Sequence, residues 1–90
     1  MSYEIYHLTW RGIEIEARYN PEHWGETAHL EIQSLVPKNE PLPITGTGYR
    51  SHFIPPRTVA EHGGAVAFVT AWLEYEAAQT GWSGAQLSLF

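Results

Sequence analysis

Residues 3–19, YEIYHLTW-RG-IEIEARY, give the clearest indication of the fold, because apolar and polar residues alternate in both halves around a short turn. Alternation of apolar and polar residues over 3–10 and 13–19 is typical of strands with one buried face. Arg11 and Gly12 between them predict a two-residue hairpin turn. The expected pairs are Trp10 with Ile13, Leu8 with Ile15 and Tyr6 with Ala17 on one face, and Thr9 with Glu14, His7 with Glu16 and Ile5 with Arg18 on the other. One face of this hairpin is therefore expected to be apolar and the other polar.

Two more strands are expected after this hairpin. Asn20 and Pro21 begin a turn-rich stretch that predicts a loop as far as Gly25. Residues 27–35 then alternate again. Their inward side chains are expected to be Ala28, Leu30 and Ile32, and their outward ones His29, Glu31 and Gln33. Several prolines and glycines interrupt the next stretch, so that only residues 49–54 fit a short edge strand.

A helix is expected in the last third of the chain. Thr58 and Glu61 have the spacing of a capping box, which predicts a helix start at Thr58. Residues 65–79 carry a broad apolar face suited to covering a sheet, and Gly81 predicts the helix end. The members of this face are Val66, Val69 and Leu73 on one stripe and Phe68, Trp72 and Tyr75 on the next. The glycine pair 63–64 predicts a kink, a separate first turn or a close approach to the sheet, and all three stay open.

These elements predict an α+β fold, in which an antiparallel meander of three or four strands is covered on one face by a C-terminal helix. The chain has 90 residues, of which 43% are hydrophobic, and this is enough for one compact core. We expect a single domain over residues 1–81 and a C-terminal tail over 82–90.

Composition excludes several classes of function. The formal net charge of -5 argues against direct binding to nucleic acid and to anionic membranes. The absence of cysteine excludes thiolate metal sites and thiol catalysis. No leader-like or membrane-spanning stretch is apparent in the sequence, so the expected location is cytoplasmic.

Catalytic and metal-binding signals are weak. His7 and His29 fall on the expected polar face near glutamates and are the candidates for a metal site. An ordinary cross-strand pair of His7 with Glu16 is the alternative, and we expect no metal and no cofactor. The sequence contains no Gly-x-Ser-x-Gly elbow and no aspartate, so an enzyme is not expected.

Two surface features suggest binding. Tyr49, Arg50 and His52 mix a cation, an imidazole and an aromatic ring, as recognition loops often do. The alternative is that Tyr49 and Phe53 anchor this segment to the core while Arg50 and His52 stay in solvent. A possible acidic surface is formed by Glu14, Glu16 and Glu31. Such a surface either imitates nucleic-acid phosphates or simply keeps the protein soluble.

The last five residues carry the most specific signal. Gln86, Leu87, Ser88, Leu89 and Phe90 resemble the bacterial DNA sliding-clamp-binding motif, Gln-Leu-(Ser or Asp)-Leu-Phe, at every position. The resemblance implies that Gln86 bonds at a small subsite, that Leu89 and Phe90 fill a hydrophobic cleft and that Leu87 makes a secondary contact. Alternatively, Leu87 and Leu89 alternate with polar residues and form a last strand of the chain's own sheet. Both interpretations stay open.

The first hypothesis is a non-enzymatic, protein-binding or regulatory protein of bacterial or mobile-element origin that docks on the clamp through this tail. Residues 49–53 and the tail also resemble small uncharacterised proteins of plasmids and phages, which implies an origin but no function. An acidic anti-defence inhibitor of the anti-CRISPR type, which occludes a nucleic-acid-binding surface, is the alternative. A small metal-dependent enzyme built on His7 and His29 is the third hypothesis, and pairing of a sheet edge into a homodimer is left open.

Overall fold

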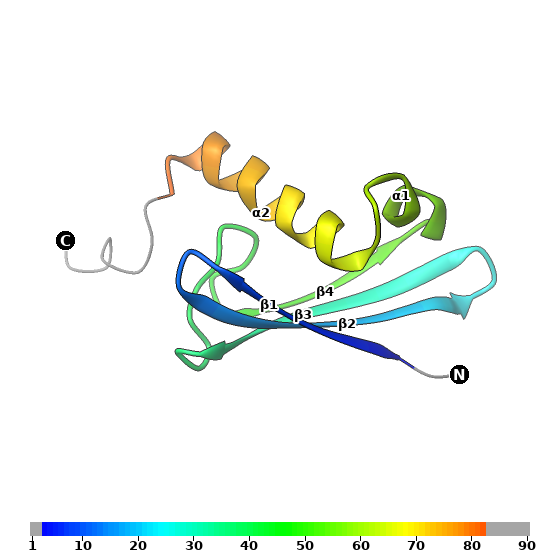
Figure 1. Ribbon diagram of the computed structural model, residues 1–90, viewed down its shortest axis with the longest axis horizontal. Coiled ribbons are helices and arrows are strands. Elements are labelled where there is room, and N and C mark those ends of the chain that lie inside the picture. The colour runs from blue at the N-terminus through cyan, green and yellow to red at the C-terminus, as the bar shows by residue number, and fades with distance from the viewer. Residues whose placement is uncertain (1–2, 83–90) are drawn as a thin grey trace.

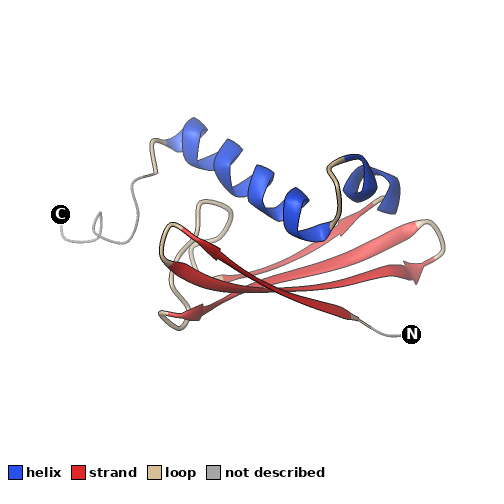
Figure 2. Ribbon diagram, in the orientation of Figure 1, coloured by secondary structure: helices blue, strands red, loops and turns tan. Residues whose placement is uncertain are grey.

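A computed structural model of the chain describes residues 3–82, with the backbone alone at residues 23 and 24. One antiparallel sheet forms one layer and a helix lies across it as the second, which confirms the expected α+β fold (Figures 1 and 2). The elements are β1 (Glu4–Trp10), β2 (Ile13–Trp24), β3 (Thr27–Val36), β4 (Tyr49–Ile54), α1 (Pro56–Glu61) and α2 (Ala65–Thr80).

The four strands follow one another in the order β1-β2-β3-β4, so the sheet is a simple meander with β1 and β4 at its edges. The first hairpin has the predicted turn, with Arg11 at φ 49° and Gly12 at φ 83°. All six cross-strand pairs expected for this hairpin are present, from Ile5 opposite Arg18 to Trp10 opposite Ile13. The apolar alternation and the turn type therefore set this register together.

The second strand is longer than the sequence predicts. A loop from Asn20 to Gly25 was expected, but β2 continues to Trp24, and the tight turn falls at Gly25 and Glu26. A register shift between Asn20 and Trp24 places Pro21 at an irregularity of the ladder, where a missing N–H is tolerated. The Asn20 side chain is buried and accepts a hydrogen bond of 3.1 Å from the backbone N–H of Glu22. With this local hydrogen bond the chain continues as an irregular strand, although Asn20 and Pro21 favour a loop.

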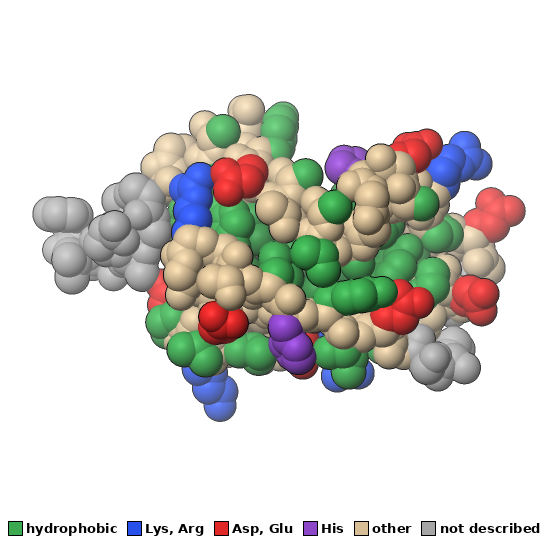
Figure 3. Space-filling model, in the orientation of Figure 1, with side chains coloured by type: hydrophobic (Ala, Val, Ile, Leu, Met, Phe, Trp, Pro, Cys, Tyr) green, Lys and Arg blue, Asp and Glu red, His purple; other side chains and the backbone are tan. Residues whose placement is uncertain are grey.

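The hydrophobic core lies between α2 and the sheet, where hydrophobic side chains form a band in Figure 3. Its sheet side is the apolar face predicted from alternation, including Ile15, Ala17 and Leu30, which are completely buried. Its helix side is formed chiefly by Phe68, Val69, Leu73 and Ala77, together with Ala65. Of the predicted apolar stripes, Val66 and Trp72 are only half-buried, and Tyr75 is 61% exposed. The described residues contain no helix with the length and hydropathy needed to cross a membrane.

The helical part begins earlier than predicted and is divided in two. The prediction of a capping box at Thr58 was wrong. Thr58 lies inside α1, which starts at Pro56, and the N-terminus of α1 has no side-chain cap. Proline is well suited to a first helical turn, since its missing N–H has no partner there anyway. Gly63 and Gly64 have φ values of 98° and 115° and separate α1 from α2, so of the three alternatives the separate first turn is observed. The predicted stop at Gly81 is confirmed by its left-handed φ of 69°.

Helix α2 does not cover the sheet evenly. It lies nearest to β1 and β2, and the segment between β3 and β4 covers part of the remaining inner face with Leu42 and Ile44, which are buried. Ser34, also buried, holds that segment by donating a 2.7 Å hydrogen bond to the carbonyl oxygen of Glu40. The space beside α2 and above β4 is left less filled.

Candidate interaction surfaces

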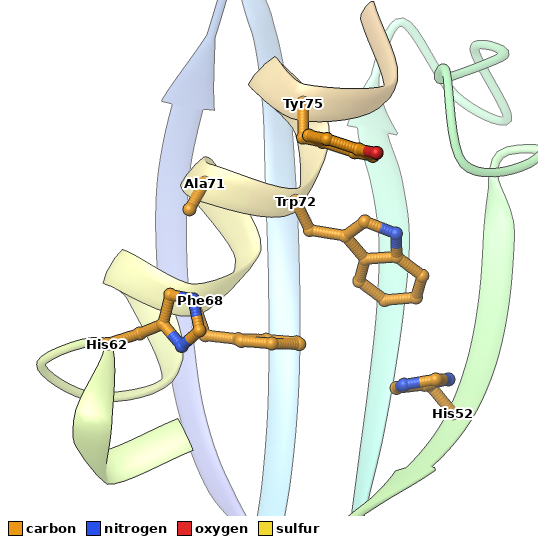
Figure 4. Close-up of a pocket in the computed structure, with 6 residues that line it drawn as sticks. All are labelled: His52, His62, Phe68, Ala71, Trp72 and Tyr75. Atoms are coloured by element: carbon orange, nitrogen blue, oxygen red, sulfur yellow. The ribbon is translucent and has the colours of Figure 1, made fainter. Parts of the chain in front are cut away.

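A groove with a volume of about 450 Å³ lies between α2 and β4 (Figure 4). Its lining residues come from three elements and are His52 of β4, His62 at the end of α1, and Phe68, Ala71, Trp72 and Tyr75 of α2. The groove exists because α2 lies over the other half of the sheet. Its size falls within the range of about 300–1,000 Å³ found for ligand pockets.

The rings in the groove support one another. The indole of Trp72 on α2 and the imidazole of His52 on β4 lie next to each other (Figure 4), with their ring centroids 4.6 Å apart and their planes tilted by 46°. Phe68 lies 5.8 Å from Trp72 and 5.2 Å from His62, again between ring centroids. The guanidinium carbon of Arg50 lies 5.3 Å from the Trp72 ring centroid, which is a cation–π distance. These contacts hold the aromatic wall in place before any ligand arrives.

The electrostatics of the groove are set by His52 and Arg50. Burial lowers the pKa of His52 below its ordinary value, and the nearby positive charge of Arg50 lowers the pKa further. Near pH 7 the His52 imidazole is therefore neutral and offers one donor and one acceptor. Arg50 remains charged and donates a 2.8 Å hydrogen bond from Nη1 to the carbonyl oxygen of Ile44.

The predicted recognition residues are divided between the two faces of β4. Tyr49 and Phe53 lie on the open face and are 43% and 53% exposed, so the idea that they anchor the segment to the core was wrong. Arg50 and His52 lie on the helix side, because they pair with Ile32 and Leu30, two buried residues of β3. Of these residues only His52 lines the groove, while Arg50 is exposed and lies beside the groove next to Trp72.

The open face of the sheet carries the three glutamates predicted as an acidic surface. Glu14 accepts a 3.0 Å hydrogen bond from Thr9, and Glu16 lies 3.4 Å from Nε2 of His7. Glu31 lies 3.6 Å from Nε of Arg18 and accepts a 2.9 Å hydrogen bond from the Tyr49 hydroxyl. The face thus mixes both signs of charge and aromatic groups, and each glutamate is already engaged.

The two candidate metal ligands are not brought together. His7 pairs with Glu16, whereas His29 lies opposite Asn20, four residues further along β2. Within the described part of the chain, no three His or Glu side chains come close enough to hold a metal ion.

A hydrogen-bonded cluster around His29 was missed by the sequence analysis. His29 is 7% exposed, its Nδ1 lies 2.7 Å from the Tyr3 hydroxyl and its Nε2 lies 2.7 Å from the Ser51 hydroxyl. The Phe53 ring stacks on the imidazole with the centroids 4.6 Å apart. Ser51 and Phe53 contact His29 because of the register between β3 and β4. The alternation of residues within each strand does not predict that register. The cluster fastens the edge strand β4 and the N-terminal segment to β3.

Residues 3–82 match a family model described as the KlcB third domain. The chain belongs to this family. KlcB is a plasmid-associated family, which agrees with the expected mobile-element origin. Searches of curated proteins and of solved structures gave no match. The KlcB third-domain match therefore identifies the folded part and assigns no activity to it.

The folded part is fixed close to the start of the predicted tail. Trp82, the last residue matched by the KlcB third domain model, packs against the core and donates its backbone N–H to the Ala77 carbonyl oxygen at 2.9 Å. Arg11 in the hairpin turn donates a 3.2 Å hydrogen bond to the Trp82 carbonyl oxygen. The clamp-like residues 86–90 lie outside the described residues and outside the match.

Proposed function

We propose that this member of the KlcB third domain family is a non-catalytic protein-binding module that docks on a protein of DNA transactions, the bacterial sliding clamp. The docking element is the tail Gln86–Phe90. The observation that carries the proposal is the agreement of these residues with the clamp-binding motif at all five positions. The domain would then be localised to DNA without contacting it, in keeping with its net charge of -5.

The tail supplies the apolar side chains that such docking needs. Burying Leu89 and Phe90 in a hydrophobic cleft contributes about 1.5–3 kcal/mol for each side chain, and Leu87 adds a smaller contact. Ordering a short peptide offsets part of this gain. Binding in the micromolar range corresponds to about 8 kcal/mol, so the hydrogen bonds of Gln86 and of the peptide backbone must add to these apolar contacts.

The anchoring of Trp82 limits how far the domain can be from the clamp. Three residues separate Trp82 from Gln86, so their Cα atoms are at most about 15 Å apart, given roughly 3.8 Å for each step. A docked tail would therefore hold the folded domain beside the clamp surface. The groove on α2 and the open face of the sheet would be carried to the same place.

The acidic-inhibitor alternative has less support. A surface that imitates nucleic-acid phosphates needs a field of one sign, but the guanidinium of Arg18 lies 3.6 Å from the Glu31 carboxylate on the same face. The described face is therefore a mixed surface, and the tail is the better basis for a function.

Competition for the clamp cleft tests the proposal. A fluorescent peptide with the sequence of residues 86–90 is bound to a purified bacterial sliding clamp and displaced by the unlabelled chain. We expect Phe90→Ala and Leu89→Ala each to weaken displacement about tenfold or more, since each removes about 1.5 kcal/mol or more of apolar contact. Ser88→Asp is the matched control, because it keeps the motif. Equal displacement by Phe90→Ala and the wild-type chain would refute the proposal.

A further inference from the structure

We infer that the groove between α2 and β4 is a second docking site, for a short acidic segment of a partner protein that carries one large apolar side chain. This site is separate from the tail and goes beyond clamp binding. A chain with both sites would link two proteins.

The apolar half of the groove fits one large side chain. Phe68, Trp72 and Tyr75 project from successive turns of α2 and line the aromatic side of the groove (Figure 4). Tyr75 is 61% exposed, so part of this wall is open to solvent. The volume of about 450 Å³ suits an aromatic or leucine side chain together with a few neighbouring atoms of its segment. Because Trp72 is already held by His52 and Arg50, docking orders few groups on this side.

The charged and polar groups at the groove favour an acidic partner segment. Arg50 stands beside Trp72, and the hydrogen bond that the structure gives it, to Ile44, uses one of five N–H donors. The residues that line the groove include two imidazoles and no carboxylate, although the chain has ten glutamates and a net charge of -5. A carboxylate next to the apolar anchor would meet the free guanidinium donors and the His52 imidazole. A basic segment would instead be placed against Arg50.

A titration followed by NMR tests this inference on the full chain. The isotope-labelled protein is titrated with three blocked peptides, acetyl-EEFEE-amide, acetyl-KKFKK-amide and acetyl-EEAEE-amide. We expect EEFEE to shift the indole N–H signal of Trp72 and to bind with a dissociation constant of about 1 mM or below. We expect the other two peptides to bind about fivefold more weakly or worse. Binding of KKFKK as strong as that of EEFEE, or an unmoved Trp72 signal, would overturn the inference.

Variants separate this site from the tail and from loss of the fold. Tyr75→Ala and Arg50→Gln are each expected to weaken EEFEE binding about threefold or more. The matched control is Ile5→Ala, which changes an exposed apolar residue on the opposite face and should leave EEFEE binding unchanged. The chain without residues 86–90 is expected to bind EEFEE as the intact chain does, whatever its affinity for the clamp. Binding that appears only after the tail is removed would show that the tail itself fills the groove, and would overturn the assignment to a partner.

Discussion

The Glu74 carboxylate on α2 accepts a 2.8 Å hydrogen bond from the indole nitrogen of Trp10 at the end of β1, 64 positions earlier in the chain. Its other oxygen accepts a 2.9 Å hydrogen bond from Arg11 in the hairpin turn. One carboxylate thus fastens the helix to the first hairpin. Because α2 is held over β1 and β2, the side of the sheet at β4 stays open and the groove forms there.

Replacing Glu74 tests this attachment. Trp10 is buried, so Glu74→Ala leaves its indole N–H without an acceptor, and we expect the free energy of unfolding to fall by about 1–2 kcal/mol. The pairing with Arg11 is half-exposed and adds little to this loss. The measurement is urea denaturation, and Glu76→Ala on the same helix is the control, with an expected change within about 0.5 kcal/mol. Equal stability of the two variants would contradict the attachment.

Gly48 closes the segment between β3 and β4 and cannot carry a side chain. Its φ is +77°, and a Cβ atom there would lie 2.6 Å from the backbone carbon of Asn39. We expect Gly48→Ala to lower the free energy of unfolding by at least about 2 kcal/mol. Gly46→Ala, where a Cβ atom meets nothing within 4 Å, is expected to change it by less than about 1 kcal/mol. If thermal and urea denaturation showed Gly48→Ala to be as stable as Gly46→Ala, the close approach would be wrong.

The stability of the fold is expected to depend on pH through His52. Burial and Arg50 lower the pKa of His52 from its ordinary value of 6.5, and unfolding restores that value. Between the two pKa values the unfolded chain binds more protons, so stability falls as the pH drops below about 6.5. The free energy of unfolding of the wild-type chain should therefore decline more steeply than that of His52→Gln between about pH 7.5 and pH 5.5. Parallel curves for the two proteins would show that the imidazole does not carry this effect.

Removing the negative charges of the open face is expected to leave clamp binding intact. The triple variant Glu14→Gln, Glu16→Gln and Glu31→Gln keeps hydrogen-bonding side chains at each position while neutralising all three carboxylates. We expect its affinity for the clamp, measured by fluorescence polarisation, to stay within about threefold of the wild-type value, since exposed charges contribute little. A tenfold loss would assign clamp binding to the acidic face and not to the tail.

The sequence predicts those parts of the fold that depend on local patterns. The hairpin over residues 3–19 is an example, because alternation and a two-residue turn are both local. The end of β2 is a counter-example, since Asn20 and Pro21 favour a turn locally but are absorbed into an irregular strand by burial and ladder hydrogen bonds. Local propensity was outweighed by tertiary packing there.

The groove could be predicted only in part. The sequence predicts Phe68, Trp72 and Tyr75 on one stripe of the helix and His52 in a recognition segment, but it does not predict that His52 contacts Trp72. In β4 both faces carry aromatic and polar residues, so alternation does not show which face is buried. The contact between His52 and Trp72 depends on the register between β3 and β4 and on the position of α2 over β1 and β2. Long-range contacts set both.

Calorimetric titration of a purified bacterial sliding clamp with the intact chain, and with the chain lacking Gln86–Phe90, determines whether the tail binds the clamp. We predict a micromolar dissociation constant for the intact chain, corresponding to about 8 kcal/mol, and no binding after truncation. Circular dichroism of the truncated chain should show an unchanged fold and melting temperature. Failure of the intact chain to bind, with a melting temperature that falls on truncation, would contradict the claim and make the tail part of the chain's own fold.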